Sequence, residues 1–212
     1  MKKFIYEEHS IGKLILLIGV LLAVPLLVLP FYPEDAVYIP AFLIPALFSI
    51  LLGLGIGFLS GKKKEQESCR GYLYSSSMTV LAAWGYGIAA GAAPFVIAGQ
   101  LTVVQALFEA VSGWTTTGLS VMNVADASHI FLFHRSFMQF CGGLGFVMMM
   151  LIFIQEKESM NLYSAEGHPD RLLPNLGKTA RAIFVMYCAF LTAGVIAYVL
   201  AGMPLFDSIN HT

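Results

Sequence analysis

Five long stretches without a charged residue constrain the fold of this chain more than any other feature. They lie between Lys13 and Glu34, Asp35 and Lys62, Arg70 and Glu109, Arg135 and Glu156, and Arg181 and Asp207. A helix that crosses a bilayer needs about 20 mainly apolar residues, and each stretch is long enough to hold one. Because lipid offers no partner for open backbone groups, the spanning segments must be helical.

Composition and charge exclude other classes of protein. Of the 212 residues, 58% are hydrophobic and only 12% are charged, whereas soluble domains carry about 25% charged residues. A net charge of −1 argues against a nucleic-acid partner, which would require a basic stripe. The three cysteines, Cys69, Cys141 and Cys188, fit no metal or disulfide spacing, so we expect no cofactor in the chain.

The sequence therefore predicts an all-α polytopic membrane protein with about five transmembrane helices. The predicted helices cover residues 14–31, 37–59, 73–97, 135–155 and 180–201. Many glycines lie inside these helices, and small residues let helices approach closely, which favours a packed bundle. The first apolar run has an alternative interpretation as a signal peptide. No small-x-small cleavage site follows it, however, so we expect a retained helix.

The basic residues predict the orientation of the chain. Eleven of the twelve lysines and arginines lie before the first predicted helix, after the second, or between the fourth and the fifth, and the exception is Arg135. Positively charged loops stay in the cytoplasm. We therefore expect a multi-pass protein of the plasma (inner) membrane, in contact with the lipid bilayer, with a cytoplasmic N-terminus.

One apolar segment, residues 101–121, is too short to span. Thr102 and Gln105 form a capping-box pattern at the start of a short helix, and Gly113 is a plausible stop. Twelve helical residues rise only about 18 Å, so the segment enters the membrane and returns. Non-helical backbone at that depth must be buried in protein or line a water-filled path.

Three threonines and a glycine follow this short helix. Potassium filters replace the hydration shell of the ion with backbone carbonyls, and Gly118 permits the positive φ or the close packing needed to aim such carbonyls. The alternative is an external Thr/Gly loop beside a surface helix. The re-entrant length and the flanking spans favour a filter. An echo of Leu107–Ser112 at Leu205–Asn210, with Pro204 near its start, predicts a second short helix of the same kind.

Three motifs together resemble the Trk/Ktr/HKT superfamily of potassium transporters, in particular its TrkH-type membrane subunits. Residues 108–118 (FEAVSGWTTTG) are similar to the first pore loop of the family. Residues 134–145 (HRSFMQFCGGLG) are similar to the helix that follows it, and residues 202–211 (GMPLFDSINH) to the start of the second pore helix. The two spans before residue 70 resemble the extra N-terminal hairpin of TrkH-type members.

The resemblance implies a membrane subunit of a potassium uptake system, with potassium as the substrate. It divides the chain into an N-terminal hairpin at 1–70, a complete helix–pore–helix repeat at 71–156, and a loop, a helix and an incomplete second pore helix at 157–212. Thr115, Thr116, Thr117, Gly118 and Leu119 would line the first quarter of the filter. The carbonyls of Thr116, Thr117 and Gly118 would be the ligands of K⁺.

The resemblance also implies partners and further segments. The family works with a cytoplasmic nucleotide-binding regulatory subunit of the TrkA/KtrA type, and a homodimer is an assembly that it allows. Because the family carries four repeats, we expect this chain to be the N-terminal part of a transporter and inactive alone. The alternatives are a non-conducting membrane fragment and a single-pore-loop subunit that tetramerises into a cation channel.

The remaining candidate residues concern the surroundings of the filter. Glu109 lies with Ser112 and Gly113 on the predicted pore helix. It could add negative potential near the outer mouth, brace the filter through hydrogen bonds, or be a solvated carboxylate near the helix start. Arg135 is expected to act as an interfacial or bracing cation. Gly142, Gly143 and Gly145 are expected to serve close helix packing rather than phosphate binding. The predicted spans hold no catalytic constellation, so we do not expect an enzyme.

Overall fold

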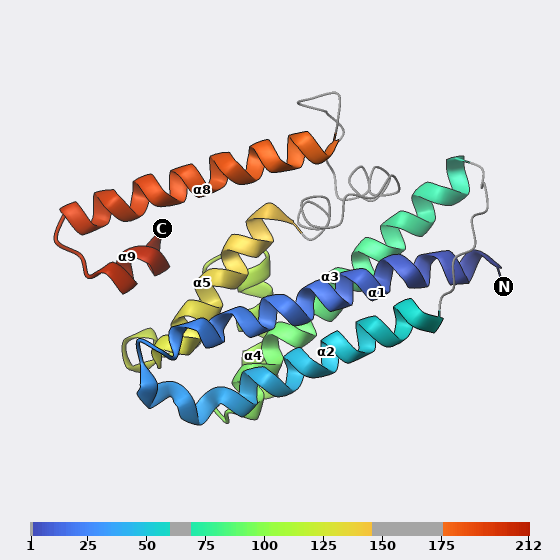
Figure 1. Ribbon diagram of the computed structural model, residues 1–212. Helices are drawn as coiled ribbons and strands as arrows, with labels where there is room; N and C mark the ends of the chain where they lie inside the picture. The colour runs from blue at the N-terminus through green and yellow to red at the C-terminus, as the bar shows by residue number, and fades with distance from the viewer. Residues whose placement is uncertain (1, 60–68, 146–175) are drawn as a thin grey trace.

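The computed structural model describes residues 2–59, 69–145 and 176–212, and within them the fold is entirely helical (Figure 1). Seven α-helices and three short 3-10 helices occur in these ranges, and no strand does. This confirms the predicted fold class. A helix satisfies its backbone amides within its own segment, which is what a membrane-spanning segment in lipid requires.

The first two long helices form a hairpin. The helix α1 (Lys2–Ala23) is continued by η1 (Val24–Val28), and η2 (Pro33–Tyr38) leads into α2 (Ile39–Leu59). The two long helices touch backbone to backbone at Gly53, where a Cβ would lie 2.6 Å from the amide nitrogen of Leu16. Glycine thus allows the close approach that the sequence predicted for its small residues.

A long helix, a short helix and a third helix follow in the order expected from the sequence. The helix α3 (Cys69–Ile97) is followed by α4 (Val103–Trp114), which folds back beside it, and η3 (Val124–Asp126) leads into α5 (His129–Leu144). After the second undescribed segment, α8 (Leu176–Leu200) runs along the outside and α9 (Leu205–His211) turns back from its end (Figure 1).

Within the described ranges, four helical stretches are long and apolar enough to cross a membrane. They are Ile11–Val28, Pro33–Leu59, Met78–Ile97 and Thr179–Leu200. Each matches a predicted span. The remaining prediction, 135–155, begins within α5, and its part after residue 145 lies outside the described residues. An unbroken helix through that range is wrong at Gly145, because this residue has a φ of 77°.

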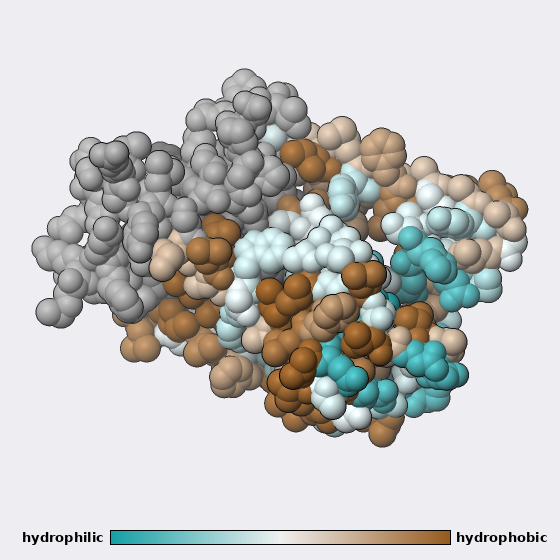
Figure 2. Space-filling view, turned by 180° about the vertical axis from the view of Figure 1, so that it is seen from behind, coloured by the Kyte–Doolittle hydropathy of each residue, from teal (hydrophilic) through white to brown (hydrophobic). Residues whose placement is uncertain are grey.

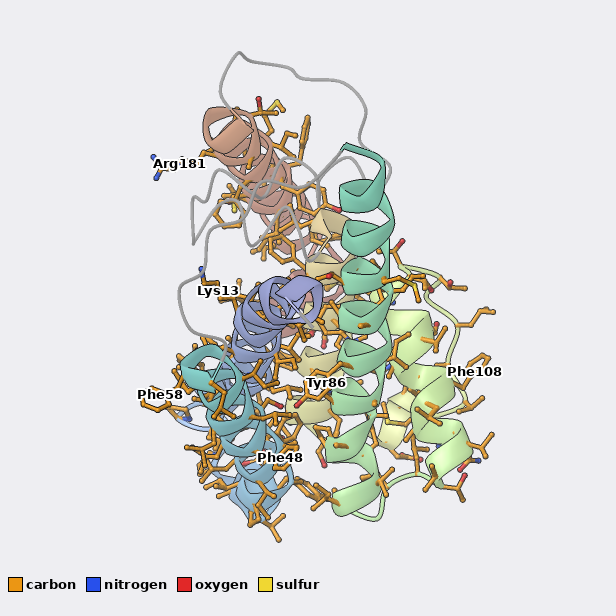
Figure 3. All side chains as sticks on the ribbon, turned by 90° about the vertical axis from the view of Figure 1, so that its right-hand side faces the viewer. Lys13, Phe48, Phe58, Tyr86, Phe108 and Arg181 are labelled. Atoms are coloured by element: carbon orange, nitrogen blue, oxygen red, sulfur yellow. The ribbon has the colours of Figure 1, made fainter. Side chains whose placement is uncertain are left out.

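The surface agrees with a lipid solvent. In Figure 2 apolar residues cover much of the described face, and hydrophilic residues gather on the right-hand part of the view. Figure 3 shows Phe58 of α2 and Phe108 of α4 pointing away from the helices, and Phe58 is 89% exposed. The chain is a multi-pass membrane protein.

Helix α3 is also tied to α2 by Tyr86, whose hydroxyl donates to Ser49 at 2.8 Å.

Candidate functional site

The short helix α4 begins as the sequence predicted and ends one residue later. The hydroxyl of Thr102 accepts a hydrogen bond from the Gln105 amide, and the Gln105 side chain accepts one from the Thr102 amide at 3.1 Å, so the capping box is confirmed. Gly113 is not the stop, because the helix continues to Trp114. A Cβ at Gly113 would lie 3.2 Å from the side chain of Met138, so this glycine makes room for α5.

The chain after Trp114 folds back over the end of α4. The amides of Thr117 and Gly118 both donate to the carbonyl of Ser112, at 2.9 and 3.4 Å. Thr116 has a φ of 57° and Gly118 one of 79°, so two residues of this turn lie in the left-handed region. Of the two requirements that the sequence left open for Gly118, a positive φ or close packing, the positive φ is the one present. The positive φ of Thr116 was not predicted, because threonine rarely adopts this conformation.

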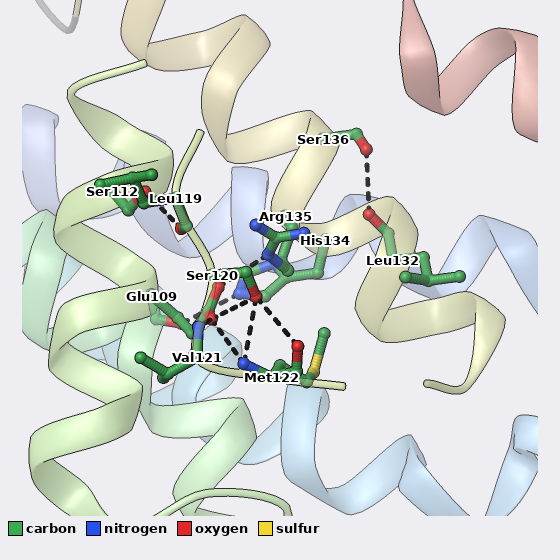
Figure 4. Close-up of polar contacts among 11 residues, drawn as sticks. Glu109, Ser112, Leu119, Ser120, Val121, Met122, Leu132, His134, Arg135 and Ser136 are labelled. Atoms are coloured by element: carbon green, nitrogen blue, oxygen red, sulfur yellow. Dashed lines mark hydrogen bonds and ion pairs between the residues drawn. The ribbon is translucent and has the colours of Figure 1, made fainter. Parts of the chain in front are cut away.

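Hydroxyl groups hold the two ends of the segment. The Thr115 hydroxyl donates to the carbonyl of Val111 at 2.7 Å. The Ser112 hydroxyl donates to the carbonyl of Leu119 at 2.6 Å, as Figure 4 shows. The Leu119 carbonyl is therefore engaged by the protein itself. Within the described residues, no N–H or O–H group donates to the carbonyls of residues 116–118.

Glu109 is buried at the centre of a polar network (Figure 4). The residue is 1% exposed, and Oε1 accepts from the Ser120 hydroxyl and the Val121 amide, both at 2.6 Å, and from the Met122 amide at 3.1 Å. Its other oxygen, Oε2, accepts from Nε of Arg135 at 2.7 Å. The interpretation of Glu109 as a solvated carboxylate is wrong. One oxygen holds the backbone that follows residue 119, and the other is held by α5.

The glycines at the end of α5 have three different surroundings. A Cβ at Gly142 would overlap the backbone carbonyl of Trp114, so this glycine lets α5 touch the last residue of α4. A Cβ at Gly143 would meet the hydroxyl of Tyr187 and lie 3.6 Å from Cγ2 of Thr116. Gly145 forms the C-cap of α5 with a positive φ. Glycine is therefore needed at position 145 for its backbone conformation, whereas the sequence predicted a role in close helix packing.

This difference predicts unequal effects for two neighbouring substitutions. Gly142→Ala is expected to destabilise the protein by about 3 kcal/mol, because a methyl group must push the backbone of α4 away. Gly143→Ala is expected to cost less than about 1 kcal/mol, because the tyrosine side chain can turn aside. Denaturation of the purified variants in detergent micelles measures both. Equal losses of stability would contradict the packing described here.

The second short helix lies where the sequence echo predicted it. α9 begins at Leu205, with Pro204 as its N-cap, and its Asp207 corresponds to Glu109 of α4. Asp207 is exposed, however, whereas Glu109 is buried. The network around Glu109 is built by residues that follow α4.

Two contacts near the start of α5 were not predicted from the sequence. Asp35 is 4% exposed, and its Oδ2 accepts a hydrogen bond from the Ile130 amide at 2.9 Å. The rings of Tyr32 and His129 stack with their centroids 3.7 Å apart. The one signal in the sequence was the position of Asp35 between two charge-free stretches. Nothing local revealed a partner 95 residues away.

Comparison with known proteins places these features in one family. Residues 39–212 match the family model described as TrkH, cation transport protein. The chain is 31% identical to the Trk system potassium uptake protein TrkG of Escherichia coli K12, over 96% of this chain and 42% of that protein. It is 28% identical to an uncharacterized cation transporter of Methanocaldococcus jannaschii, with the same two shares covered.

A solved structure agrees with the sequence matches. The crystal structure of the potassium transporter TrkH from Vibrio parahaemolyticus matches with a TM-score of 0.74 and 29% identity, over 98% of this chain and 42% of that chain. The chain thus spans less than half the length of these relatives. The family match over most of the chain and the shared fold show that it belongs to the TrkH family of cation transport proteins.

Proposed function

We propose that this chain contributes the first of several filter segments to a potassium uptake protein, and that Thr115–Leu119 is that segment. The observation that carries the proposal is the buried Glu109, which accepts hydrogen bonds from the backbone on the C-terminal side of Thr115–Leu119. The end of α4 holds the N-terminal side of the segment. A segment held at both ends and strained between them is what a rigid ring of carbonyls requires.

The local geometry supports potassium as the substrate. Left-handed residues at 116 and 118 interrupt the alternation of peptide directions in an extended strand, which allows successive carbonyls to face the same side. The carbonyls of Thr116, Thr117 and Gly118 are the proposed ligands, whereas the Leu119 carbonyl is committed to Ser112. The C-terminal end of α4 adds a partial negative charge near the ion.

The orientation and the partners are part of the same proposal. The positive loops favour a cytoplasmic N-terminus in the inner membrane, and the proposed filter segment would then enter from the outside. Several relatives are named as Trk system potassium uptake proteins. From the family resemblance we propose a cytoplasmic nucleotide-binding regulatory subunit as the partner, with a homodimer as an assembly that the family allows.

A chimera tests this function. In it, residues 1–212 replace the matching segment of Vibrio parahaemolyticus TrkH, which makes up 42% of that protein. We expect the purified chimera to carry potassium into liposomes in preference to sodium. A chimera that is folded and dimeric but conducts neither ion selectively would contradict the proposal.

The isolated chain provides the second test. One filter segment supplies about a quarter of the carbonyl ring, because potassium filters use four such loops. We therefore expect no selective flux from the 212-residue chain alone in liposomes. Mass measurement of the solubilised protein decides the alternative: selective flux from a tetramer would favour a single-pore-loop channel, and selective flux from a monomer would refute both interpretations.

A further inference from the structure

The connection between α1 and α2 reaches the helices on both sides of it. At the left-hand end of Figure 1, the turn between η1 and α2 lies beside the start of α5 and the short helix α9. Tyr32 of this turn stacks on His129 of α5, and the ring of Phe206 in α9 contacts Tyr32 edge to face at 5.0 Å. The hairpin is thus packed onto the region that follows the proposed filter.

Within this contact, Asp35 caps α5 from a distant part of the chain. The first amides of a helix have no partner within the helix. Ser128 occupies the N-cap of α5, and its side chain makes no capping bond. The carboxylate of Asp35 accepts from the Ile130 amide instead, and its negative charge lies at the positive end of the helix dipole.

The capped helix carries the cation that orients Glu109. Arg135 lies about one and a half turns after Ile130 on α5 and donates to Oε2 of Glu109 at 2.7 Å. Glu109 in turn accepts from the amides of Val121 and Met122. A continuous set of hydrogen bonds and one helical segment therefore join Asp35 to the backbone that follows residue 119.

We propose that Asp35 is a positioning residue for the filter, because it fixes the start of α5 and thereby the direction of Arg135 and Glu109. The inference rests on the function proposed above for Thr115–Leu119. It assigns to the N-terminal hairpin a part in ion selectivity besides its part in packing. The loss of this cap would leave the first turn of α5 frayed and Glu109 less firmly held.

Three variants of the chimera test the role of Asp35. Asp35→Ala removes the acceptor, and we expect a lower potassium-to-sodium flux ratio and a higher KM for potassium. The rate of amide hydrogen exchange at Ile130, Val121 and Met122 should rise at least about fivefold, the factor that corresponds to one lost N-cap. Asp35→Asn keeps an acceptor oxygen and should restore the flux ratio. The control is Glu34→Gln, on the adjacent side chain, which is 63% exposed and lies 3.9 Å from Nδ1 of His129. Because a solvent-exposed pair contributes little, this variant should leave the ratio unchanged.

Each outcome has a definite meaning. An unchanged flux ratio in Asp35→Ala would overturn the inference, provided that Gly118→Ser lowers the ratio in the same chimera. If Gly118→Ser has no effect either, the proposed filter itself fails. A ratio that falls in Asp35→Ala and is not rescued by Asp35→Asn would also overturn it. Should Asp35→Ala fail to accumulate, Asp35→Ser carries the same expectation, because its shorter side chain does not reach the Ile130 amide.

Discussion

Replacing Glu109 with alanine is expected to abolish potassium-selective uptake by the chimera and to destabilise it by about 3 kcal/mol or more. The substitution leaves Arg135, only 14% exposed, without its carboxylate, and it leaves the Val121 and Met122 amides without an acceptor. Removing one partner of a buried ion pair costs about 3–5 kcal/mol, because the other charge stays buried. Thermal unfolding in detergent and potassium flux into liposomes measure the two effects.

Two further variants separate the charge of Glu109 from its hydrogen bonds. Glu109→Gln keeps one acceptor oxygen for the backbone amides but loses the charge that faces Arg135, so we expect an intermediate loss of both properties. A double-mutant cycle with Arg135→Gln then isolates the coupling between the two side chains. If Glu109→Ala kept the stability and the flux ratio of the parent chimera, the bracing role would be refuted.

Gly118→Ser is expected to lower the ratio of potassium to sodium flux about tenfold. A Cβ at this position would meet Nε2 of Gln139 at 3.7 Å, which is an ordinary contact, so crowding is not the cause. The cause is the φ of 79°. A side chain in the left-handed region costs about 1–2 kcal/mol, and the backbone relieves this strain by turning the neighbouring carbonyls.

The chain offers a matched control for backbone strain. Gly99, between α3 and α4, has a φ of 68°, and a Cβ added there would meet no atom within 4 Å. Gly99→Ser should therefore cost a similar amount of stability and leave the flux ratio unchanged. Gly118→Asn, with a residue that tolerates positive φ better, should fall between serine and glycine. Equal effects of the two serine substitutions on selectivity would contradict a filter at Gly118.

The spans and the short helix could be predicted from the sequence because their signals are local. The charge-free stretches place four membrane-spanning stretches to within a few residues, although α1 begins well before its predicted start. Thr102 with Gln105 marks the start of α4. Gly118 could be predicted because glycine is the residue that a positive φ selects. At Gly145 the same requirement was missed, because a run of apolar residues conceals the end of a helix.

The contacts that hold the proposed filter could not be predicted, since their partners are distant in the sequence. Arg135 lies 26 residues from Glu109, and Asp35 lies 95 residues from Ile130. Neither pair has a helical or strand spacing, so only the packed arrangement of the helices brings them together. The positive φ of Thr116 is of the same kind, because the surrounding hydrogen bonds impose it against the preference of the residue.

Carbonyl resonances of the filter segment provide the most direct measurement of the central claim. Residues 1–212, labelled with ¹³C at the carbonyl carbons of threonine, glycine and leucine, are ligated to the unlabelled remainder of the chimera and placed in lipid. Titration with potassium is expected to shift the carbonyl signals of Thr116, Thr117 and Gly118 in a saturable manner, whereas equal sodium leaves them in place and the Leu119 region follows only weakly. Signals that do not respond to potassium in a chimera that still transports it would contradict the assignment of Thr115–Leu119 as a filter.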